Sequence, residues 1–159
     1  FNVRNIIEVL GDNPFVDAEL VDEAVSIFQT GEYDYVANAS NDYVTDIEED
    51  KFPTGIRVQM YSKVVAKEYL RDDIKLLSHP SSFLYVNPEI YSSKLFGAVR
   101  NFKELSGFSE LNISVNYPHN LEFARKIFRK FGNDVSISQV LLEITKNPSL
   151  RDLLSQKNV

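Results

Sequence analysis

The sequence contains no cysteine, and this absence excludes several kinds of chemistry. Without thiols the chain can form no disulfide, no thiolate zinc site and no cysteine nucleophile. Glycine and proline occur only six times each among 159 residues, too few for a collagen-like or low-complexity protein. No stretch approaches the roughly 20 consecutive apolar residues of a membrane-spanning helix. We therefore expect a soluble, cytoplasmic protein with no membrane partner.

Glycine and histidine are also too sparse, or wrongly spaced, for several well-known sites. The glycines stand at positions 11, 31, 55, 97, 107 and 132, so neither a G-x-G-x-x-G turn nor a Walker loop is present. The two histidines, His79 and His119, form no metal-binding pair with nearby carboxylates, and no G-x-S-x-G segment occurs. Zinc enzymes and serine hydrolases of that kind are therefore excluded.

The charge balance restricts the partners of the chain. Seventeen lysines and arginines stand against 23 aspartates and glutamates, which gives a net charge of −6. A nucleic acid backbone would be repelled overall, so we expect no nucleic acid partner and at most a small, metal-accompanied nucleotide. The length and the 43% hydrophobic content suit one compact domain, which we place at residues 1–134, with a helical tail at 135–159.

The hydrophobic periodicity indicates alternating strands and helices in the first part of the chain. An apolar run at residues 6–10 predicts a buried strand that opens into a G-D-N-P turn. Apolar residues at helical spacing extend from Leu20 to Phe28, and Gly31 ends this helix. Residues 33–37 form the next strand, so strand, helix and strand make a parallel crossover unit. The fold class is therefore α/β, with a mostly parallel sheet flanked by helices.

Further elements are predicted along the rest of the chain. Residues 56–61 alternate as a half-buried strand does, and Ser62 caps a helix that runs to about residue 70. The later elements, in chain order, are strands at 95–99 and 111–115, a helix at 118–131, and two short helices separated by a break at Asn147 and Pro148.

Polar residues follow several of these strands. In open α/β sheets, ligands bind beyond the carboxyl ends of the strands, where loops and helix N-termini converge. Asp12, Asn13, Asn38 and Asn116 occupy such positions, and a carboxylate there can hold Mg²⁺ against a nucleoside triphosphate. One carboxylate alone binds this ion weakly, and Asp12 in G-D-N-P is also an ordinary turn residue. Both interpretations remain open on the sequence alone.

His79 has two interpretations as well. It stands in a Ser-His-Pro sequence that is typical of a helix start, where its imidazole could donate a hydrogen bond to an anionic ligand. A solvent-exposed cap is the more common role of such a residue. His119, in the first turn of the predicted 118–131 helix, is interpreted as a surface residue.

Five short segments, in order along the chain, carry a more specific pattern. They read IIEVLGDNPFVD at 6–17, YDYVAN at 33–38, FPTGIRVQ at 52–59, H at 79 with NPE at 87–89, and LNISVNYPHNLE at 111–122. These segments resemble "R-x-x-G-D-x-P-hydrophobic-x-D", "D-Y-V-S-N", "P-x-G-L-D-V-E", "E-H-V-T" with "N-P-E", and "L-R-L-T-V-D-T-P-E-D-L-E" of the cytidylyltransferase family. That family includes the acylneuraminate and KDO cytidylyltransferases and a spore-coat polysaccharide branch.

The resemblance implies a Rossmann-like nucleotide-diphospho-sugar transferase fold and a homodimer. In this family Mg²⁺-bound CTP is attacked at its α-phosphorus by a sugar hydroxyl, which yields a CMP-sugar and pyrophosphate. The resemblance makes Asp12 a catalytic residue that holds Mg²⁺ together with Asn116, and it assigns substrate binding to Asn13, Asn38, Gly55, His79 and Asn116. By the same resemblance, the family's first strand and nucleotide loop, "R-x-G-S-x-R-x-x-x-K", are missing from this sequence, and we expect activity only if an upstream segment supplies the loop.

The chain departs from the family pattern at charged positions. The second metal-binding aspartate of the family is Asn116 here, its arginine is Glu8, and the acidic residues of "L-D-V-E" are Arg57 and Gln59. These changes alter the charges that would manage phosphate and metal. Two functions therefore compete. The first is a cytidylyltransferase of nucleotide-sugar biosynthesis with a diverged site, and the second is a catalytically silent domain of the same fold that acts as a regulatory or assembly partner.

Overall fold

The computed structural model describes residues 3–41, 51–69, 90–97 and 107–155. The chain divides into two compact units, each assembled from separate stretches of the sequence. Unit 1 contains Phe1–Val9, Ala18–Asn38 and Val58–Phe96, whereas unit 2 contains Leu10–Asp17, Ala39–Arg57 and Gly97–Val159. The predicted boundary after residue 134 stays a prediction.

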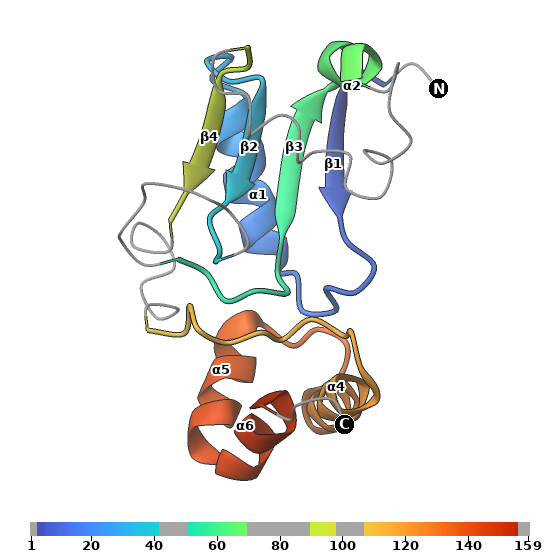
Figure 1. Ribbon diagram of the computed structural model, residues 1–159, viewed down its shortest axis with the longest axis vertical. Coiled ribbons are helices and arrows are strands. Elements are labelled where there is room, and N and C mark those ends of the chain that lie inside the picture. Colours follow the sequence, from blue (N-terminus) through green and yellow to red (C-terminus); the bar gives the residue numbers. More distant parts are fainter. Residues whose placement is uncertain (1–2, 42–50, 70–89, 98–106, 156–159) are drawn as a thin grey trace. The chain divides into compact units, whose positions relative to one another are not determined.

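A four-stranded sheet forms the centre of unit 1 (Figure 1). Its strands are β1 (Asn5–Val9), β2 (Tyr35–Asn38), β3 (Val58–Ser62) and β4 (Ser93–Phe96), in the spatial order β1-β3-β2-β4. β3 pairs antiparallel with both of its neighbours, while β2 and β4 run parallel. The described sheet is therefore mixed.

The α/β class predicted from the sequence is confirmed, but the strand pairing differs from a mostly parallel sheet. β1 and β2 do run in the same direction, as the predicted crossover requires, because each is antiparallel to β3. β3 lies between them, so the two strands are not neighbours. The periodicity of a strand indicates which of its side chains are buried, but it does not indicate which strand it pairs with. For this reason the sequence pattern did not predict that β3 lies between β1 and β2.

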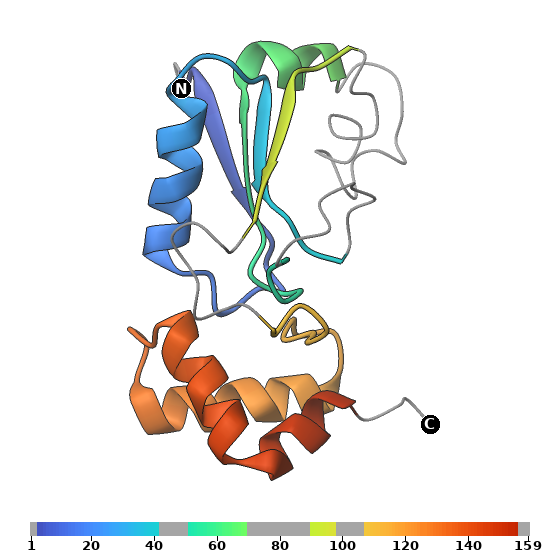
Figure 2. The same cartoon turned by 90° about the vertical axis from the view of Figure 1, so that its left-hand side faces the viewer.

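The helix α1 (Ala18–Phe28) lies along one face of this sheet (Figure 2). Its buried side chains are Leu20, Ala24 and Phe28, which recur every four residues and so share one side of the helix. Gly31 follows with a φ of 77°, a left-handed conformation that glycine adopts at little cost and that commonly ends a helix. The predicted helix and its end are confirmed.

The helix α2 (Lys63–Tyr69) begins directly after β3. The amide nitrogen of Val65 donates a hydrogen bond to the hydroxyl of Ser62 at 3.2 Å. This contact satisfies one of the free amides in the first turn of the helix, and it confirms the predicted cap.

Burial differs sharply between the paired strands β1 and β3. In β3 four of the five residues are buried, and Gln59 is only 1% exposed. In β1 no residue is fully buried, and the apolar side chains of Ile7 and Val9 are each 45% exposed. The predicted buried strand at 6–10 is thus an edge strand among the described residues. The predicted half-buried strand at 56–61 contains the inner strand β3, in which successive side chains, and therefore both faces, are buried.

Unit 2 contains the helices α4 (Pro118–Phe131), α5 (Ile137–Lys146) and α6 (Pro148–Ser155). They confirm the predicted helix at 118–131 and the break before Pro148. The ring of Phe15 packs against Phe123 at 5.7 Å and stacks on Phe128 at 5.2 Å between centroids, which anchors the segment after Leu10 on α4. None of the described helices is long and apolar enough to cross a bilayer.

The segment 111–115 forms no regular strand, contrary to the prediction. Thr54 donates a backbone hydrogen bond to Leu111 and accepts one from Ile113, at 2.9 and 2.8 Å, whereas Val115 bonds to Asp12 at 2.7 Å. Because the segment turns from one partner to another, only an isolated parallel bridge between Thr54 and Asn112 forms. The alternation of apolar and polar residues in this segment indicates an extended conformation, but it does not by itself predict a ladder of hydrogen bonds to a neighbouring strand.

Candidate functional site

Three segments of unit 2 meet around four of the predicted site residues, and we call this arrangement the loop assembly. Its segments are 10–17, 52–57 and 111–117. The first is bonded to the third by the Val115 amide, which donates to the carbonyl oxygen of Asp12 at 2.7 Å. The first is bonded to the second by the Arg57 amide, which donates to Asn13 Oδ1 at 2.8 Å. Asp12, Asn13, Gly55 and Asn116 therefore belong to one connected structure.

Asp12 is half-buried, and its carboxylate is oriented by the next residue. Asn13 Nδ2 donates to Asp12 Oδ1 at 2.7 Å, while the Asn13 backbone amide donates to the carbonyl of Leu10 at 3.0 Å. Asn13 is 7% exposed and uses both ends of its side chain within the loop assembly. It fixes the turn and holds one oxygen of Asp12, and a carboxylate has further acceptor positions that can bind a cation or a donor.

Asn116 ends a short ladder of polar side chains. Asn116 Nδ2 donates to Ser114 Oγ at 2.8 Å, and the Ser114 amide in turn donates to Asn112 Oδ1 at 3.0 Å. Ser114 is buried, whereas Asn116 is exposed. The nitrogen of the Asn116 amide is thus held by Ser114, and the amide oxygen of this exposed side chain is of a kind that binds hard cations.

Gly55 permits the close approach of two of these segments. Its φ is 104°, and a Cβ atom placed on it would lie 2.3 Å from the backbone nitrogen of Ser114. Any side chain would push the 52–57 segment away from Ser114, which is the residue that holds Asn116. The direct role of Gly55 in the structure is therefore to seat these backbones against each other, and its predicted role in substrate binding stays a prediction.

The donor set of Asp12 and Asn116 suits a metal ion that is shared with a ligand. The structure provides one carboxylate and one amide oxygen on adjacent, hydrogen-bonded segments. Within the described residues, no group of three or more histidine, aspartate or glutamate side chains could hold a metal ion by itself. Mg²⁺ commonly takes one or two protein carboxylates and completes its shell with water and substrate phosphates. The pair therefore fits an ion that arrives with a nucleotide.

Two further predicted site residues, Asn38 and His79, are not in the segments of the loop assembly. Asn38 belongs to unit 1, where it is 1% exposed and its Oδ1 accepts a hydrogen bond from the Val58 amide at 2.7 Å. This bond ties the end of β2 to the start of β3. His79 lies outside the described residues, so its role stays a prediction.

Two positioning residues, Asn112 and Ser114, were not singled out by the sequence reasoning. Together with Asn116 they form the polar half of the alternating segment 111–116. Its other side chains are Leu111 and Ile113, which are buried, and Val115, which is half-buried. An extended segment with period-two alternation places such residues on one side. That alternation was the available signal, because it predicts that Asn112, Ser114 and Asn116 lie in a row.

Comparisons with known proteins agree with this structure. No protein-family model matches the sequence. The chain is 22% identical over 147 residues to the spore coat polysaccharide biosynthesis protein SpsF of Bacillus subtilis. The matched residues make up 90% of this chain and 55% of SpsF. The solved structure of a cytidylyltransferase from Leptospira borgpetersenii superposes with a TM-score of 0.76 at 15% identity, covering 99% of this chain and 62% of that protein.

The chain thus spans about half the length of SpsF and less than two thirds of the solved cytidylyltransferase. Nearly all of it follows the fold of the latter, and the α/β, Rossmann-like class is confirmed. The resemblance to the cytidylyltransferase family, indicated by five ordered motifs in the sequence, is confirmed by these similarities in sequence and in fold.

Proposed function

We propose that this chain is part of a cytidylyltransferase of nucleotide-sugar biosynthesis, which transfers CMP from CTP to a sugar and releases pyrophosphate. Two similarities support the proposal: the distant relative is named for polysaccharide biosynthesis, and the structural neighbour is a cytidylyltransferase. The reaction requires that the triphosphate be held and its charge neutralised while a sugar hydroxyl attacks the α-phosphorus.

The observation that carries the proposal is the backbone hydrogen bond between Val115 and Asp12. It joins the two segments whose side chains the family resemblance assigns to the metal. Asp12 would supply the carboxylate and Asn116 a neutral oxygen, and Mg²⁺ bound there would neutralise the phosphates and polarise the bond that breaks. Asn13 would act as a positioning residue, because it holds one oxygen of Asp12 at 2.7 Å.

Asn38, Gly55 and His79 complete the proposed substrate site on the basis of the family resemblance, and the same resemblance supports a homodimer. The contacts in the structure give Asn38 and Gly55 structural tasks as well, since Asn38 accepts the Val58 amide and Gly55 lies against Ser114. Substitution of either residue would therefore change stability together with binding.

A specific observation favours the alternative of a catalytically silent domain. Asn116 offers no charge where the family motif has an aspartate, so the pair of Asp12 and Asn116 provides a single carboxylate. A second carboxylate typically contributes a large part of the affinity for a divalent cation. A silent domain would keep the fold and the loop contacts but would bind Mg²⁺ and CTP weakly or not at all.

Isothermal titration calorimetry with CTP and Mg²⁺ on the full-length protein separates the two proposals. Binding that requires Mg²⁺ and that Asp12→Asn abolishes would support the enzyme. The absence of heat at millimolar CTP would refute it in favour of the silent domain. Formation of pyrophosphate in the presence of candidate sugars would then test the transfer itself.

Asn116→Asp is the sharper variant, because it restores the charge that the site lacks. We expect the apparent affinity for Mg²⁺ in the presence of CTP to rise about tenfold, since an added unit charge within a few ångströms of a cation is worth at least that factor. Asn147→Asp is a control at another asparagine of unit 2 whose side chain is hydrogen-bonded to a serine hydroxyl: Asn147 Oδ1 accepts from Ser149, whereas Asn116 Nδ2 donates to Ser114. Equal responses of the two variants would place Asn116 away from the metal.

A further inference from the structure

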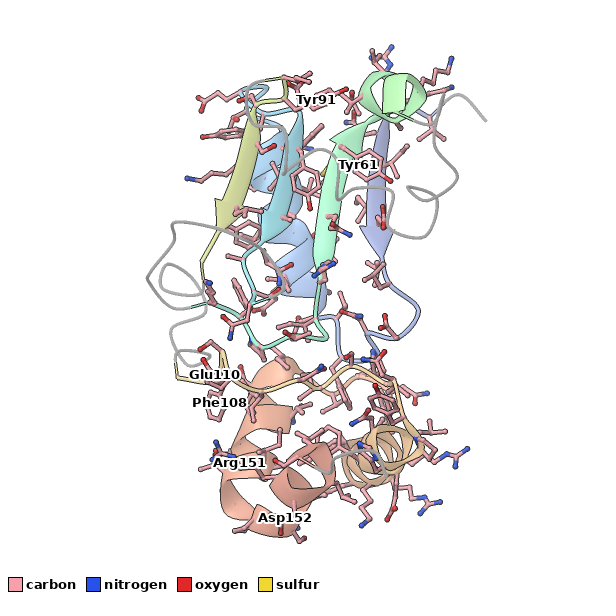
Figure 3. The ribbon with its side chains drawn as sticks, in the orientation of Figure 1. Tyr61, Tyr91, Phe108, Glu110, Arg151 and Asp152 are labelled. Carbon is pink, nitrogen blue, oxygen red and sulfur yellow. The ribbon has the colours of Figure 1, made fainter. Side chains whose placement is uncertain are left out.

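A cluster of polar side chains lies on one face of the sheet in unit 1, and we call it the sheet-face cluster. It consists of Glu8 on β1, Tyr35 on β2, and Gln59 and Tyr61 on β3. Glu8 pairs directly with Gln59 in the strand register, and Tyr35 pairs with Tyr61. Because paired residues of antiparallel strands project to the same side, all four side chains share one face. Tyr61 extends from β3 toward β1 (Figure 3).

Hydrogen bonds connect the four side chains across three strands. Tyr35 Oη donates to Gln59 Oε1 at 2.7 Å, Gln59 Nε2 donates to Glu8 Oε1 at 3.4 Å, and Tyr61 Oη donates to Glu8 Oε2 at 2.8 Å. The chain of donors therefore ends on the carboxylate of Glu8. A network of this kind fixes the orientation of its members, so the carboxylate is held in a defined position.

The burial of the cluster falls toward Glu8. Tyr35 is fully buried, Gln59 is 1% exposed and Tyr61 is 7% exposed, while Glu8 is only half-buried. Glu8 belongs to neither of the ion pairs that Lys126 forms with Glu122 and Lys130 with Glu143. A carboxylate can accept about four hydrogen bonds, and two of these positions on Glu8 are used. The cluster thus presents a negatively charged acceptor that is partly removed from water.

The charge of this cluster differs from that of the family motifs at the two positions that face each other. Where the motifs have an arginine and a glutamate, this chain has Glu8 and Gln59. The motif pair is neutral in sum, whereas the pair in this chain carries one negative charge. An acidic group placed here would be repelled, while a hydroxyl or ammonium group would be attracted.

We propose that the sheet-face cluster binds the hydroxyl or ammonium groups of a sugar, so that this chain selects a non-acidic sugar over an acidic one. This inference deepens the proposed function, on which it rests, by naming the class of sugar. Glu8 is the specificity-determining residue because it supplies the charge. Tyr61 and Gln59 are positioning residues, which hold the two carboxylate oxygens.

Three probes that share one ring and differ in one group test the proposal. They are glucosamine, which carries an ammonium group, glucose, which is neutral, and glucuronate, which carries a carboxylate. Binding to the full-length protein is measured by saturation-transfer NMR and competition. We expect affinities in the order glucosamine, glucose, glucuronate, with at least a tenfold difference between the first and the last, because the charge interaction changes sign. A preference for glucuronate, or no binding of any of the three, would overturn the proposal.

Glu8→Gln removes the charge and keeps the shape and the hydrogen-bonding capacity of the side chain. We expect the tenfold preference to disappear in this variant and to persist in Glu32→Gln, which removes the same charge from an exposed position of unit 1. Tyr61→Phe removes the 2.8 Å hydrogen bond to Glu8 and keeps the charge of Glu8, so it should reduce the preference without abolishing it. Unchanged selectivity in both cluster variants would show that the cluster serves folding alone.

A parallel titration with CTP and Mg²⁺ keeps this test separate from that of the proposed function. Mg²⁺-dependent CTP binding combined with a preference for glucuronate would refute the sugar class and leave the cytidylyltransferase proposal intact. The expected sugar preference without CTP binding would refute the transferase and support the sugar site.

Discussion

The sheet of unit 1 and the loop assembly of unit 2 stabilise polar side chains in different ways. In the sheet, the side chains of the sheet-face cluster bond mainly to one another, as in the 2.7 Å contact from Tyr35 to Gln59. In the loop assembly, polar side chains bond to backbone amides as well as to one another, since Asn13 Oδ1 accepts the Arg57 amide and Asn112 Oδ1 accepts the Ser114 amide.

This difference follows from backbone geometry. Regular strands satisfy their own amides and carbonyls, so their side chains are free to form networks across neighbouring strands. Irregular segments leave backbone groups without partners, and short polar side chains must satisfy them. The loss of stability on substitution should therefore depend on where a residue lies in the tertiary structure, and two residues of the same type can differ in this loss. Three matched pairs of substitutions test this.

The largest effect is expected at a glycine of the loop assembly. In Gly55→Ala the new Cβ would lie 2.3 Å from a backbone nitrogen, at a φ of 104°. Strain and displacement together should lower the free energy of unfolding by about 4 kcal/mol. Urea denaturation of the purified variant measures this loss.

Gly31→Ala is the matched control for this prediction. Gly31 also has a positive φ, of 77°, but nothing lies within 4 Å of the position of its Cβ. Only the conformational strain remains, so we expect a loss of about 1 kcal/mol. Similar losses at both glycines would contradict the close backbone approach at Gly55.

A smaller effect is expected from a pair of apolar residues in the sheet. Ile7 and Met60 are direct partners in the register of β1 and β3, yet Met60 is 4% exposed and Ile7 is 45% exposed. Met60→Ala should cost about 3 kcal/mol because it leaves a cavity, while Ile7→Ala should cost about 1 kcal/mol. Both values come from urea denaturation, and equal losses would show that β1 is covered in solution.

The sequence predicted most of the individual elements and less of their arrangement. Helical spacing located α1 and α4, and local signals such as Ser62 and Gly31 located the helix ends. These signals lie within a few residues of the feature that they indicate. The position of β3 between β1 and β2 depends on contacts between residues more than 20 positions apart, which no local pattern encodes.

The candidate site shows the same limit. The motifs named Asp12 and Asn116, which lie in segments that a backbone hydrogen bond joins. They did not indicate that Ser114 holds the Asn116 amide, nor that Glu8 and Gln59 face each other across two strands. Each of these facts depends on strand register and loop packing. The resemblance supplied the residues, and the structure supplied their neighbours.

The smallest effect is expected from a pair of lysines on α4. Lys130 bonds to Glu143 at 2.6 Å, and the Glu143 side chain is only 10% exposed, whereas Lys126 bonds to the exposed Glu122 at 3.0 Å. Replacement by methionine keeps most of the apolar stem and removes the charge. Lys130→Met leaves a buried carboxylate without its cation and should cost about 1 kcal/mol, while Lys126→Met should cost at most about 0.5 kcal/mol. A double-mutant cycle of Lys130→Met with Glu143→Gln measures the coupling energy of this pair, and a second cycle of Lys126→Met with Glu122→Gln measures that of the exposed pair. A coupling energy in the first cycle no larger than in the second would show that burial of Glu143 does not strengthen its ion pair.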